Sequence, residues 1–347
     1  MKAIYLFYVY TLLGSFFLLL SILLFIFETG STNLLVLNLL NLSLLKQVYF
    51  WPLLCLSFLI KIPVFPFHLW LPEAHVEAST IGSVLLAAIL LKLGGFGLFK
   101  FVIPTLPFAS FYFTPLIEVL SCLGFVYGSI SALRQLDFKK IIAYSSVVHM
   151  HLVLFSLFSF SLFGLLGSVL LMVSHGLTSA GIFFCLGVLY DRLGTRNILY
   201  IKCIFLEAPL FSVFFFLLIL SNISFPGSLN FISELICLIG IFFMFKSLNI
   251  VFIFIGLVLN TYYNFLLFNR LIFGNLYNPL PLNFFFNFFH SKFKNSLNRS
   301  NIQDLSFNEY LVLKFLLILI FYFGFFPGYL IVYGESLLVV YNIKILS

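Results

Sequence analysis

Long apolar runs and short polar segments alternate along almost the whole chain. A helix of roughly 20 apolar residues is long enough to cross the hydrocarbon core of a bilayer. By that rule the pattern predicts nine membrane spans, at 3–27, 47–71, 80–103, 113–133, 140–160, 163–190, 204–246, 247–270 and 310–333. The longest polar connectors cover residues 28–46 and 275–308. The sequence therefore predicts an all-α, polytopic transmembrane helical bundle in which residues 1–347 form a single membrane domain.

Two of the predicted spans contain helix breakers near their middle. In the span at 47–71, Lys61 is followed by Pro63, and a proline inside a helix removes a hydrogen bond and clashes with the preceding turn. The span at 204–246 is too long for one straight crossing, and Pro226-Gly227 lies near its centre. This second segment corresponds either to two spans or to one broken span.

Basic residues in the connectors distinguish these two possibilities. They gather in three segments, at 134–140, 192–202 and 270–299, and basic loops concentrate on one face of a membrane. If 204–246 is one broken span, all three segments and Met1 lie on the same face. If it were two spans, the third segment would lie on the opposite face. The sequence therefore favours one broken span.

The composition agrees with a membrane protein and excludes a soluble enzyme. The chain is 63% hydrophobic and only 8% charged, whereas soluble domains carry about 25% charged residues. Its net charge of +7 matches the basic bias of membrane loops and not a nucleic-acid-binding patch. The five cysteines stand singly, without metal-site or disulfide spacing. We therefore expect no metal, no redox cofactor and no nucleic-acid partner.

Ionisable residues lie near the centre of five predicted spans. A charge at this depth is expensive, so such residues are by default candidates for a functional site. Their similar depths indicate a row across the membrane and not a set of scattered exceptions. The candidates, in chain order, are Lys61, Lys92, His149 with its neighbour His151, His175 and Glu234.

These residue types suit proton transfer. A low-dielectric environment disfavours the charged form of lysine, so a buried lysine is able to gain and lose a proton near neutral pH. Histidine already titrates there. A carboxylate close to a lysine stabilises the charged forms of both, and moving the carboxylate away releases a proton. Broken helices add exposed backbone dipoles and room for water.

The lysines and the histidine pair also have structural interpretations. Lys61 and Lys92 could extend toward the membrane surface, but both lie too centrally to do so easily. His149 and His151 are two residues apart, so their side chains point to different faces of one helix. At least one of these two histidines is therefore expected to have a packing or structural role.

His175 and Glu234 have structural alternatives as well. Small polar residues follow His175, and such a patch suits close packing of two helices. Glu234 could instead cap the half-helix that follows Pro226-Gly227, where the helix dipole favours a negative charge. We favour the functional interpretation for both residues because each lies at the common depth.

Five motifs in the chain resemble those of a known family. They cover residues 61–78, 90–97, 134–150, 174–179 and 225–234. Together they resemble the antiporter-like subunit family of respiratory complex I, the NADH:ubiquinone oxidoreductase, and within it the mitochondrial chain 4 group. That resemblance implies about fourteen helices in two inverted repeats, each repeat with a broken helix.

The resemblance also assigns roles to the five candidate residues. Lys61 matches the proton-pumping lysine of the first broken helix, and Lys92 matches the connecting lysine of the next helix. His149 and His175 match the histidines of two further motifs. Glu234 matches the terminal glutamate of the second broken helix, a position at which the chain 2 and chain 5 relatives carry lysine. All five are expected to take part in proton transfer.

The chain departs from the family ahead of Lys61. The family has a glutamate on its fifth helix that pairs with the lysine matched by Lys61, but only 60 residues precede Lys61 here. The predicted span at 3–27 resembles the family's sixth helix, and Glu28, at the end of a span, is a poor substitute for the missing acid. We expect a separate polypeptide to supply the first five helices and the carboxylate.

The resemblance implies a multi-pass subunit of the mitochondrial inner membrane, with the basic loops and Met1 on the matrix side. Its expected function is to couple NADH:ubiquinone electron transfer to proton pumping. Its expected partners are the other membrane-arm subunits and membrane lipids. Two alternatives remain, namely a sodium/proton antiporter subunit and a structural membrane-arm subunit that has lost pumping.

Overall fold

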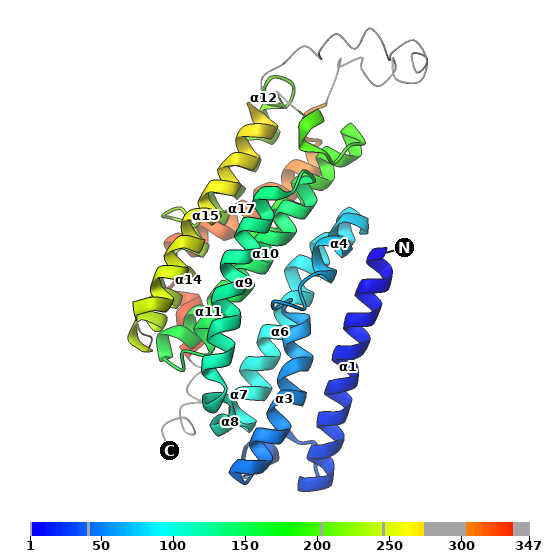
Figure 1. The fold of residues 1–347 in the computed structure, drawn as a ribbon. Helices are drawn as coiled ribbons and strands as arrows, with labels where there is room; N and C mark the ends of the chain where they lie inside the picture. Colours follow the sequence, from blue (N-terminus) through cyan, green and yellow to red (C-terminus); the bar gives the residue numbers. More distant parts are fainter. Residues whose placement is uncertain (1, 40–41, 202–203, 245–246, 274–302, 336–347) are drawn as a thin grey trace.

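The chain folds into a bundle of long helices (Figure 1). The computed structural model describes residues 2–39, 42–201, 204–244, 247–273 and 303–335. In these ranges eight helices are long and apolar enough to cross a membrane. They are α1 (Lys2–Thr29), α3 (Leu44–Lys61), the helix built from α5 to α7 (Thr80–Thr105), α9 (Thr114–Arg134), α10 (Phe138–Leu157), α11 (Leu162–Leu193), α15 (Ser247–Ile272) and α17 (Phe307–Phe325). The shorter α13 (Pro209–Asn222) and α14 (Leu229–Met244) together make the ninth crossing, so the predicted all-α polytopic bundle is confirmed.

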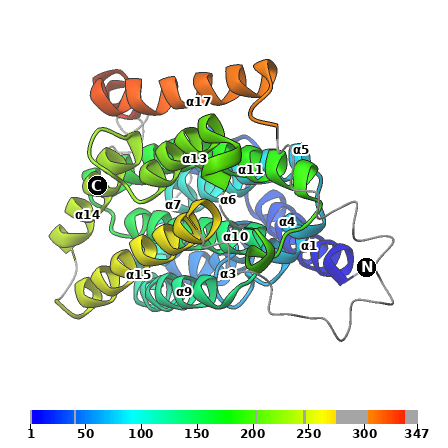
Figure 2. The same ribbon diagram turned by 90° about the horizontal axis from the view of Figure 1, so that it is seen from above.

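Helices α10 and α11 form the centre of the bundle. In their most apolar windows 89% and 78% of the residues are buried, against 17% in α1 and 22% in α17. Seen from above, α10 lies among α9, α11, α15 and α3 (Figure 2). A side chain on α10 or α11 is therefore shielded from lipid on most sides, whereas α1 keeps a broad apolar face exposed.

The first predicted break is confirmed at Lys61. Helix α3 ends at this residue, and the chain resumes a helix in α4 (Trp70–Glu77). Both halves run along α1 (Figure 1). The Trp70 indole donates a hydrogen bond to the Ile60 carbonyl at 3.1 Å, which ties the start of α4 back to the end of α3.

The second break is one interrupted crossing, as the basic loops predicted. Helix α13 ends at Asn222 and α14 begins at Leu229. The short α12 (Ile204–Glu207) before α13 lies at the same end of the bundle as the end of α15, since the rings of Phe205 and Phe273 are 5.9 Å apart (Figure 1). Because α15 crosses once, α13 and α14 also cross only once between them.

The start of α13 is fastened to the segment before α17. The backbone N–H groups of Leu210 and Phe211 donate hydrogen bonds to the two carboxylate oxygens of Asp304, at 2.9 and 3.0 Å. A carboxylate at this position satisfies N–H groups that have no partner inside the helix and complements the helix dipole. The basic end of the bundle is thus held together by contacts between segments distant in sequence.

The helix that carries Lys92 is continuous but not uniformly α-helical. It consists of α5 (Thr80–Leu85), the π-helical segment η1 (Leu86–Leu90), α6 (Leu91–Gly97), a second π-helical segment η2 (Leu98–Val102) and α7 (Ile103–Thr105). Each π-helical turn is wider than an α-helical turn, and such turns occur often at functional sites. The sequence pattern predicts the span but not these two segments.

Two boundaries differ from the predicted ones. The last helix, expected over 310–333, is interrupted after Phe325, because Phe326 and Pro327 leave the helical conformation. The connector expected at 28–46 contains the short helix α2 (Leu34–Leu39) and the start of α3. Most of the connector expected at 275–308, together with Met1, lies outside the described residues.

Candidate functional site

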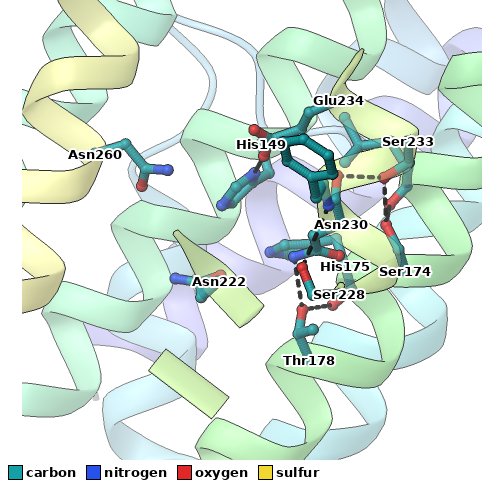
Figure 3. A network of polar contacts seen from close by, with 12 residues as sticks. His149, Ser174, His175, Thr178, Asn222, Ser228, Asn230, Ser233, Glu234 and Asn260 are labelled. Carbon is teal, nitrogen blue, oxygen red and sulfur yellow. Dashed lines mark hydrogen bonds and ion pairs between the residues drawn. The ribbon is translucent and has the colours of Figure 1, made fainter. Parts of the chain in front are cut away.

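Four of the five candidate residues meet at the centre of the bundle. The Lys92 ammonium nitrogen lies 3.1 Å from Nδ1 of His175. The His175 and His149 rings have centroids 4.9 Å apart, and Nδ1 of His149 lies 3.2 Å from Oε1 of Glu234. The result is a row that passes from α6 through α11 and α10 to α14. Figure 3 shows the His175, His149 and Glu234 side chains of this row. The structure thus brings these four residues together, and their role in proton transfer stays a prediction.

The row is shielded from the surroundings. His149 and His175 are 1% exposed and Glu234 is 5% exposed, while Lys92 is partly buried. His149 and Glu234 are at ion-pair distance but are not aligned for a hydrogen bond. Charges interact more strongly here than at a surface because the effective dielectric constant is low. A proton that moves between these groups therefore changes the energy of its neighbours.

The π-helical turn before Lys92 helps to aim its side chain. The ammonium group donates a hydrogen bond to the carbonyl oxygen of Ala87, five residues earlier and inside η1. Gly176 lies against the same helix, because a Cβ at that position would stand 3.6 Å from Cε of Lys92 and 3.3 Å from the Ala88 carbonyl oxygen. His175 thus supplies a partner for the Lys92 ammonium group, and Gly176 leaves space for the lysine side chain.

Close backbone packing fixes the position of Glu234. A Cβ on Gly167 or Gly240 would overlap the backbone of Cys237 or Gly164, so α14 and α11 are in backbone contact. Polar pairs add to this contact, since the hydroxyls of Ser233 and Ser174 lie 2.9 Å apart (Figure 3). The carboxylate of Glu234 is therefore held at a defined place relative to the histidines.

Lys61 lies apart from the row. It is the last residue of α3 and is only half buried, and its ammonium nitrogen is 5.7 Å from the centre of the Phe58 ring. Within the part of the chain that the structure describes, it forms no ion pair. Its neighbour Ile62 packs against Gly94, two residues beyond Lys92. The two lysine-bearing helices therefore touch, but the geometry does not link their charged groups directly.

His151 has a structural role. Its Nε2 accepts a hydrogen bond from the Phe65 backbone N–H at 3.2 Å, and its Nδ1 lies 2.8 Å from the Val147 carbonyl oxygen. Since a carbonyl only accepts, Nδ1 carries the proton and the ring is neutral with both nitrogens used. The ring packs directly on Gly124, where a side chain would overlap it. His151 thus supports the first break, while His149 faces the row.

Several buried polar residues were not predicted from the sequence as part of the site. His68 and His75, inside the first motif, are buried, and the His75 ring stacks on Phe183 with centroids 4.3 Å apart. A second group lies near the break after α13 and comprises Asn222, Asn230, Asn260, Tyr263 and Asn264. The spacing of Asn260 and Asn264, four residues apart on one helix face, was the only sequence signal for this group.

The residues and the fold define a class of membrane protein. Residues 1–260 match the family model described as NADH:quinone oxidoreductase/Mrp antiporter, TM. The chain belongs to this family of membrane-embedded, antiporter-like proteins. The resemblance predicted from the five motifs is thereby confirmed.

Individual relatives narrow the comparison. The chain is 44% identical over 327 residues to NADH-ubiquinone oxidoreductase chain 4 of Chondrus crispus, covering 94% of this chain and 63% of that protein. It is 48% identical over 275 residues to the protein of the same name from Arabidopsis thaliana, covering 79% of this chain and 55% of that protein. Among solved structures, it superposes with a TM-score of 0.84 and 26% identity on a chain of respiratory complex I from Thermus thermophilus with bound NADH, covering 96% of this chain and 68% of that one. The chain thus spans 55–63% of the length of these two curated relatives.

Proposed function

We propose that this chain is a proton-translocating membrane-arm subunit of respiratory complex I, which couples NADH:ubiquinone electron transfer in other subunits to proton pumping. The observation that carries the proposal is the row from Lys92 through His175 and His149 to Glu234. Every member of the row is able to take and release a proton. The names of the relatives support complex I and not the sodium/proton antiporter alternative.

The first transfer in the row needs no large movement. A protonated Lys92 faces Nδ1 of His175 at 3.1 Å, a distance at which one hydrogen bond carries the proton from the amine to the imidazole. The product is a neutral lysine beside an imidazolium. His175 next passes the proton toward His149, where Glu234 stabilises the positive charge at 3.2 Å. Charge changes in neighbouring subunits would shift the energies of these steps and set their direction.

Lys61 would complete the row with help from another subunit. A half-buried ammonium group in a membrane is costly without an opposite charge beside it. Among the described residues, the Lys61 ammonium group contacts the Phe58 ring and forms no ion pair. We propose that a separate membrane-arm polypeptide places a carboxylate beside Lys61. In a structure of the assembled complex, that carboxylate should lie within about 4–8 Å of Lys61, a range over which charges couple. Lipid alone beside α1 would contradict this part of the proposal.

The proposed location is the mitochondrial inner membrane with the basic end of the bundle in the matrix. Lys139 and Arg196 lie at this end of the bundle, where both contact the Tyr190 ring. There the Phe138 N–H also donates a hydrogen bond to the Arg196 carbonyl at 3.2 Å. Basic loops face the side from which a membrane protein is inserted. The test is labelling of a cysteine introduced at Thr195, in the loop after α11, which should be blocked in sealed mitoplasts and occur after they are opened.

The decisive experiment replaces Lys92 in the assembled complex. Lys92→Met keeps the length and apolar stem of the side chain but removes the transferable proton, so NADH oxidation should continue while the number of protons pumped per electron falls. The control is Lys100→Met, because Lys100 lies on the same helix, is exposed and contacts only the Phe96 ring among described partners. Wild-type pumping by Lys92→Met would favour the structural alternative, and sodium-dependent transport would favour an antiporter.

A further inference from the structure

A chain of polar side chains joins α15 to the end of α13. The Tyr263 hydroxyl donates to Oδ1 of Asn260. The Asn264 amide nitrogen donates to the Asn260 backbone oxygen at 2.9 Å and to its side-chain oxygen at 3.1 Å. The Asn222 amide nitrogen in turn donates to Oδ1 of Asn264 at 3.0 Å. All four residues are at most 2% exposed, so the chain lies entirely inside the bundle.

The hydrogen bonds fix which way each amide points. The backbone oxygen of Asn260 only accepts hydrogen bonds, so Asn264 must turn its nitrogen toward it and its oxygen toward Asn222. Asn222 must then offer its nitrogen to Asn264. Its own oxygen is consequently directed away from α15. That oxygen is buried and has no hydrogen-bond partner among the described residues.

Two further acceptors follow on the other side of the break. Asn230 donates through its amide nitrogen to Oγ1 of Thr178 at 3.4 Å, and its oxygen is buried without a hydrogen-bond partner in the described chain. One turn later, Oε1 of Glu234 is also buried without a hydrogen bond among the described residues, although it lies at ion-pair distance from His149. In the view of Figure 3, Asn222 lies on one side of the histidine rings and Asn230 with Ser233 on the other. The break is therefore lined by oxygens that accept and do not donate.

Such a lining selects a ligand. Leaving a buried acceptor unsatisfied destabilises the fold, and buried waters satisfy groups of this kind with about two to four hydrogen bonds each. Oxygens with only acceptor capacity favour a species rich in donors, and protonated water is such a species. The His149 and His175 rings, with centroids 4.9 Å apart, share no direct hydrogen bond, because both ring nitrogens of His149 and Nε2 of His175 have no hydrogen-bond partner among the described residues. This arrangement suits transfer through water.

We propose that Asn222 and Asn230 bind the proton-carrying water of the broken helix, and that Asn260, Tyr263 and Asn264 are positioning residues that hold the acceptor oxygen of Asn222 in place. This inference rests on the proposed function and adds a site to it. The ligand is water that carries the proton between the His175 and His149 rings, since Glu234 already lies 3.2 Å from His149. Asn222 contributes a fixed acceptor at the end of α13, and Asn230 contributes a second one at the start of α14.

The test measures protons pumped per electron in the assembled complex in sealed vesicles. The double variant Asn222→Leu/Asn264→Leu removes both partners of one hydrogen bond, so it leaves no unpaired amide between α13 and α15. It should lower the ratio by an amount similar to Lys92→Met.

A neighbouring residue provides the matched control. Ser221 is as buried as Asn222, but its hydroxyl donates within its own helix to the Leu218 carbonyl at 2.7 Å. Ser221→Ala should therefore pump as the wild type does. If Lys92→Met lowers the ratio and the double variant does not, the water site is wrong while the proposed function stands. A loss in Ser221→Ala as large as in the double variant also overturns the site.

A second measurement keeps the proposal testable if the double variant fails to assemble. A high-resolution map of the wild-type complex should contain an ordered water within hydrogen-bond distance of Oδ1 of Asn222, and a further one at Oδ1 of Asn230. The absence of both waters from a map that resolves other buried waters would overturn the inference. If Lys92→Met pumps as the wild type does, the proposed function fails and the water site fails with it.

Discussion

The two broken helices place their charged residues in different surroundings. At the first break, Lys61 ends α3, is half buried and contacts one aromatic ring among the described residues. At the second break, Glu234 lies in the second turn of α14, is 5% exposed and faces His149 at 3.2 Å. The second break also carries Asn222 and Asn230, whereas apolar and aromatic residues dominate the first.

The difference shows how a membrane protein supports a charge at depth. The cost of burying a charge falls when an opposite charge and hydrogen bonds surround it. This chain provides those groups itself around Glu234. Around Lys61, the described residues do not provide them. The second break is therefore provided with its partners in this chain, and the first is the place where we propose that a neighbouring subunit contributes a carboxylate.

Replacement of Glu234 should have the largest effect on activity. Glu234→Gln keeps the shape of the side chain but cannot take up a proton, so the number of protons pumped per electron should fall strongly while NADH oxidation continues. Proton uptake by sealed vesicles measures this. Glu28→Gln serves as the control, because Glu28 forms an exposed ion pair with Lys46 that contributes little to stability. Equal pumping by Glu234→Gln and the wild type would remove the second break from the pathway.

Replacement of Lys61 should weaken the contact with the neighbouring subunit. If a carboxylate from that subunit pairs with Lys61, Lys61→Met leaves it unpaired at a cost of about 3–5 kcal/mol when the pair is buried. Native electrophoresis at rising detergent concentrations should show earlier loss of the neighbour. Lys92→Met should not have this effect, since the Lys92 partner is His175 of the same chain. Equal retention in both variants would mean that Lys61 needs no partner from outside.

Glycines at the two breaks should differ in their tolerance of alanine. At Gly324 of α17, a Cβ would overlap the backbone of Gly227 and Ser228 at the second break. At Gly94, its nearest contact would be the Ile62 side chain at 2.6 Å, with backbone atoms at 3.1 Å. Because backbone yields less easily than a side chain, Gly324→Ala should destabilise the purified protein more than Gly94→Ala, by about 1–3 kcal/mol.

A thermal unfolding series in detergent ranks these alanine variants. Gly328→Ala is the control, because a Cβ there meets nothing within 4 Å. A smaller loss for Gly324→Ala than for Gly94→Ala would show that the second break is the more adaptable of the two. That result would contradict the rigid packing of α17 on the break.

The smallest effect is expected at His151, which supports the first break. His151→Gln keeps one hydrogen-bond acceptor for the Phe65 N–H, so it should cost about 1 kcal/mol of stability or less and leave pumping unchanged. His149→Gln, two residues away, should lower the proton-to-electron ratio. A similar loss of pumping in both variants would mean that the two histidines share one role.

Much of the fold follows from the sequence because lipid imposes a simple rule on it. An apolar helix must reach a certain length to cross the bilayer. The prolines beside Lys61 and at position 226 each break a helix. The depth of each ionisable residue within its run then aligns Lys92, His175 and Glu234. These inferences need no knowledge of which helices touch.

The remaining parts of the site depend on which helices touch, and the sequence does not contain that directly. Asn222 and Asn264 are 42 residues apart, and nothing in the sequence pattern pairs one with the other. The orientation of Asn222 further depends on a backbone oxygen of α15. Likewise, depth alone cannot show that Lys61 lies outside the row, because depth says nothing about the direction around the helix axis.

The direction in which the Lys92 side chain points depends on the π-helical winding of η1. A π turn holds about one residue more than an α turn, and one residue of an α-helix corresponds to roughly 100° of rotation. If the segment rewound as a plain α-helix with all its residues kept, the wider turn would no longer absorb the extra residue. Every side chain on one side of the segment would then swing by about that angle relative to the other side, and the ammonium group would no longer face His175. The contact between Lys92 and His175 thus depends on the extra residue held by η1 as well as on the lysine itself.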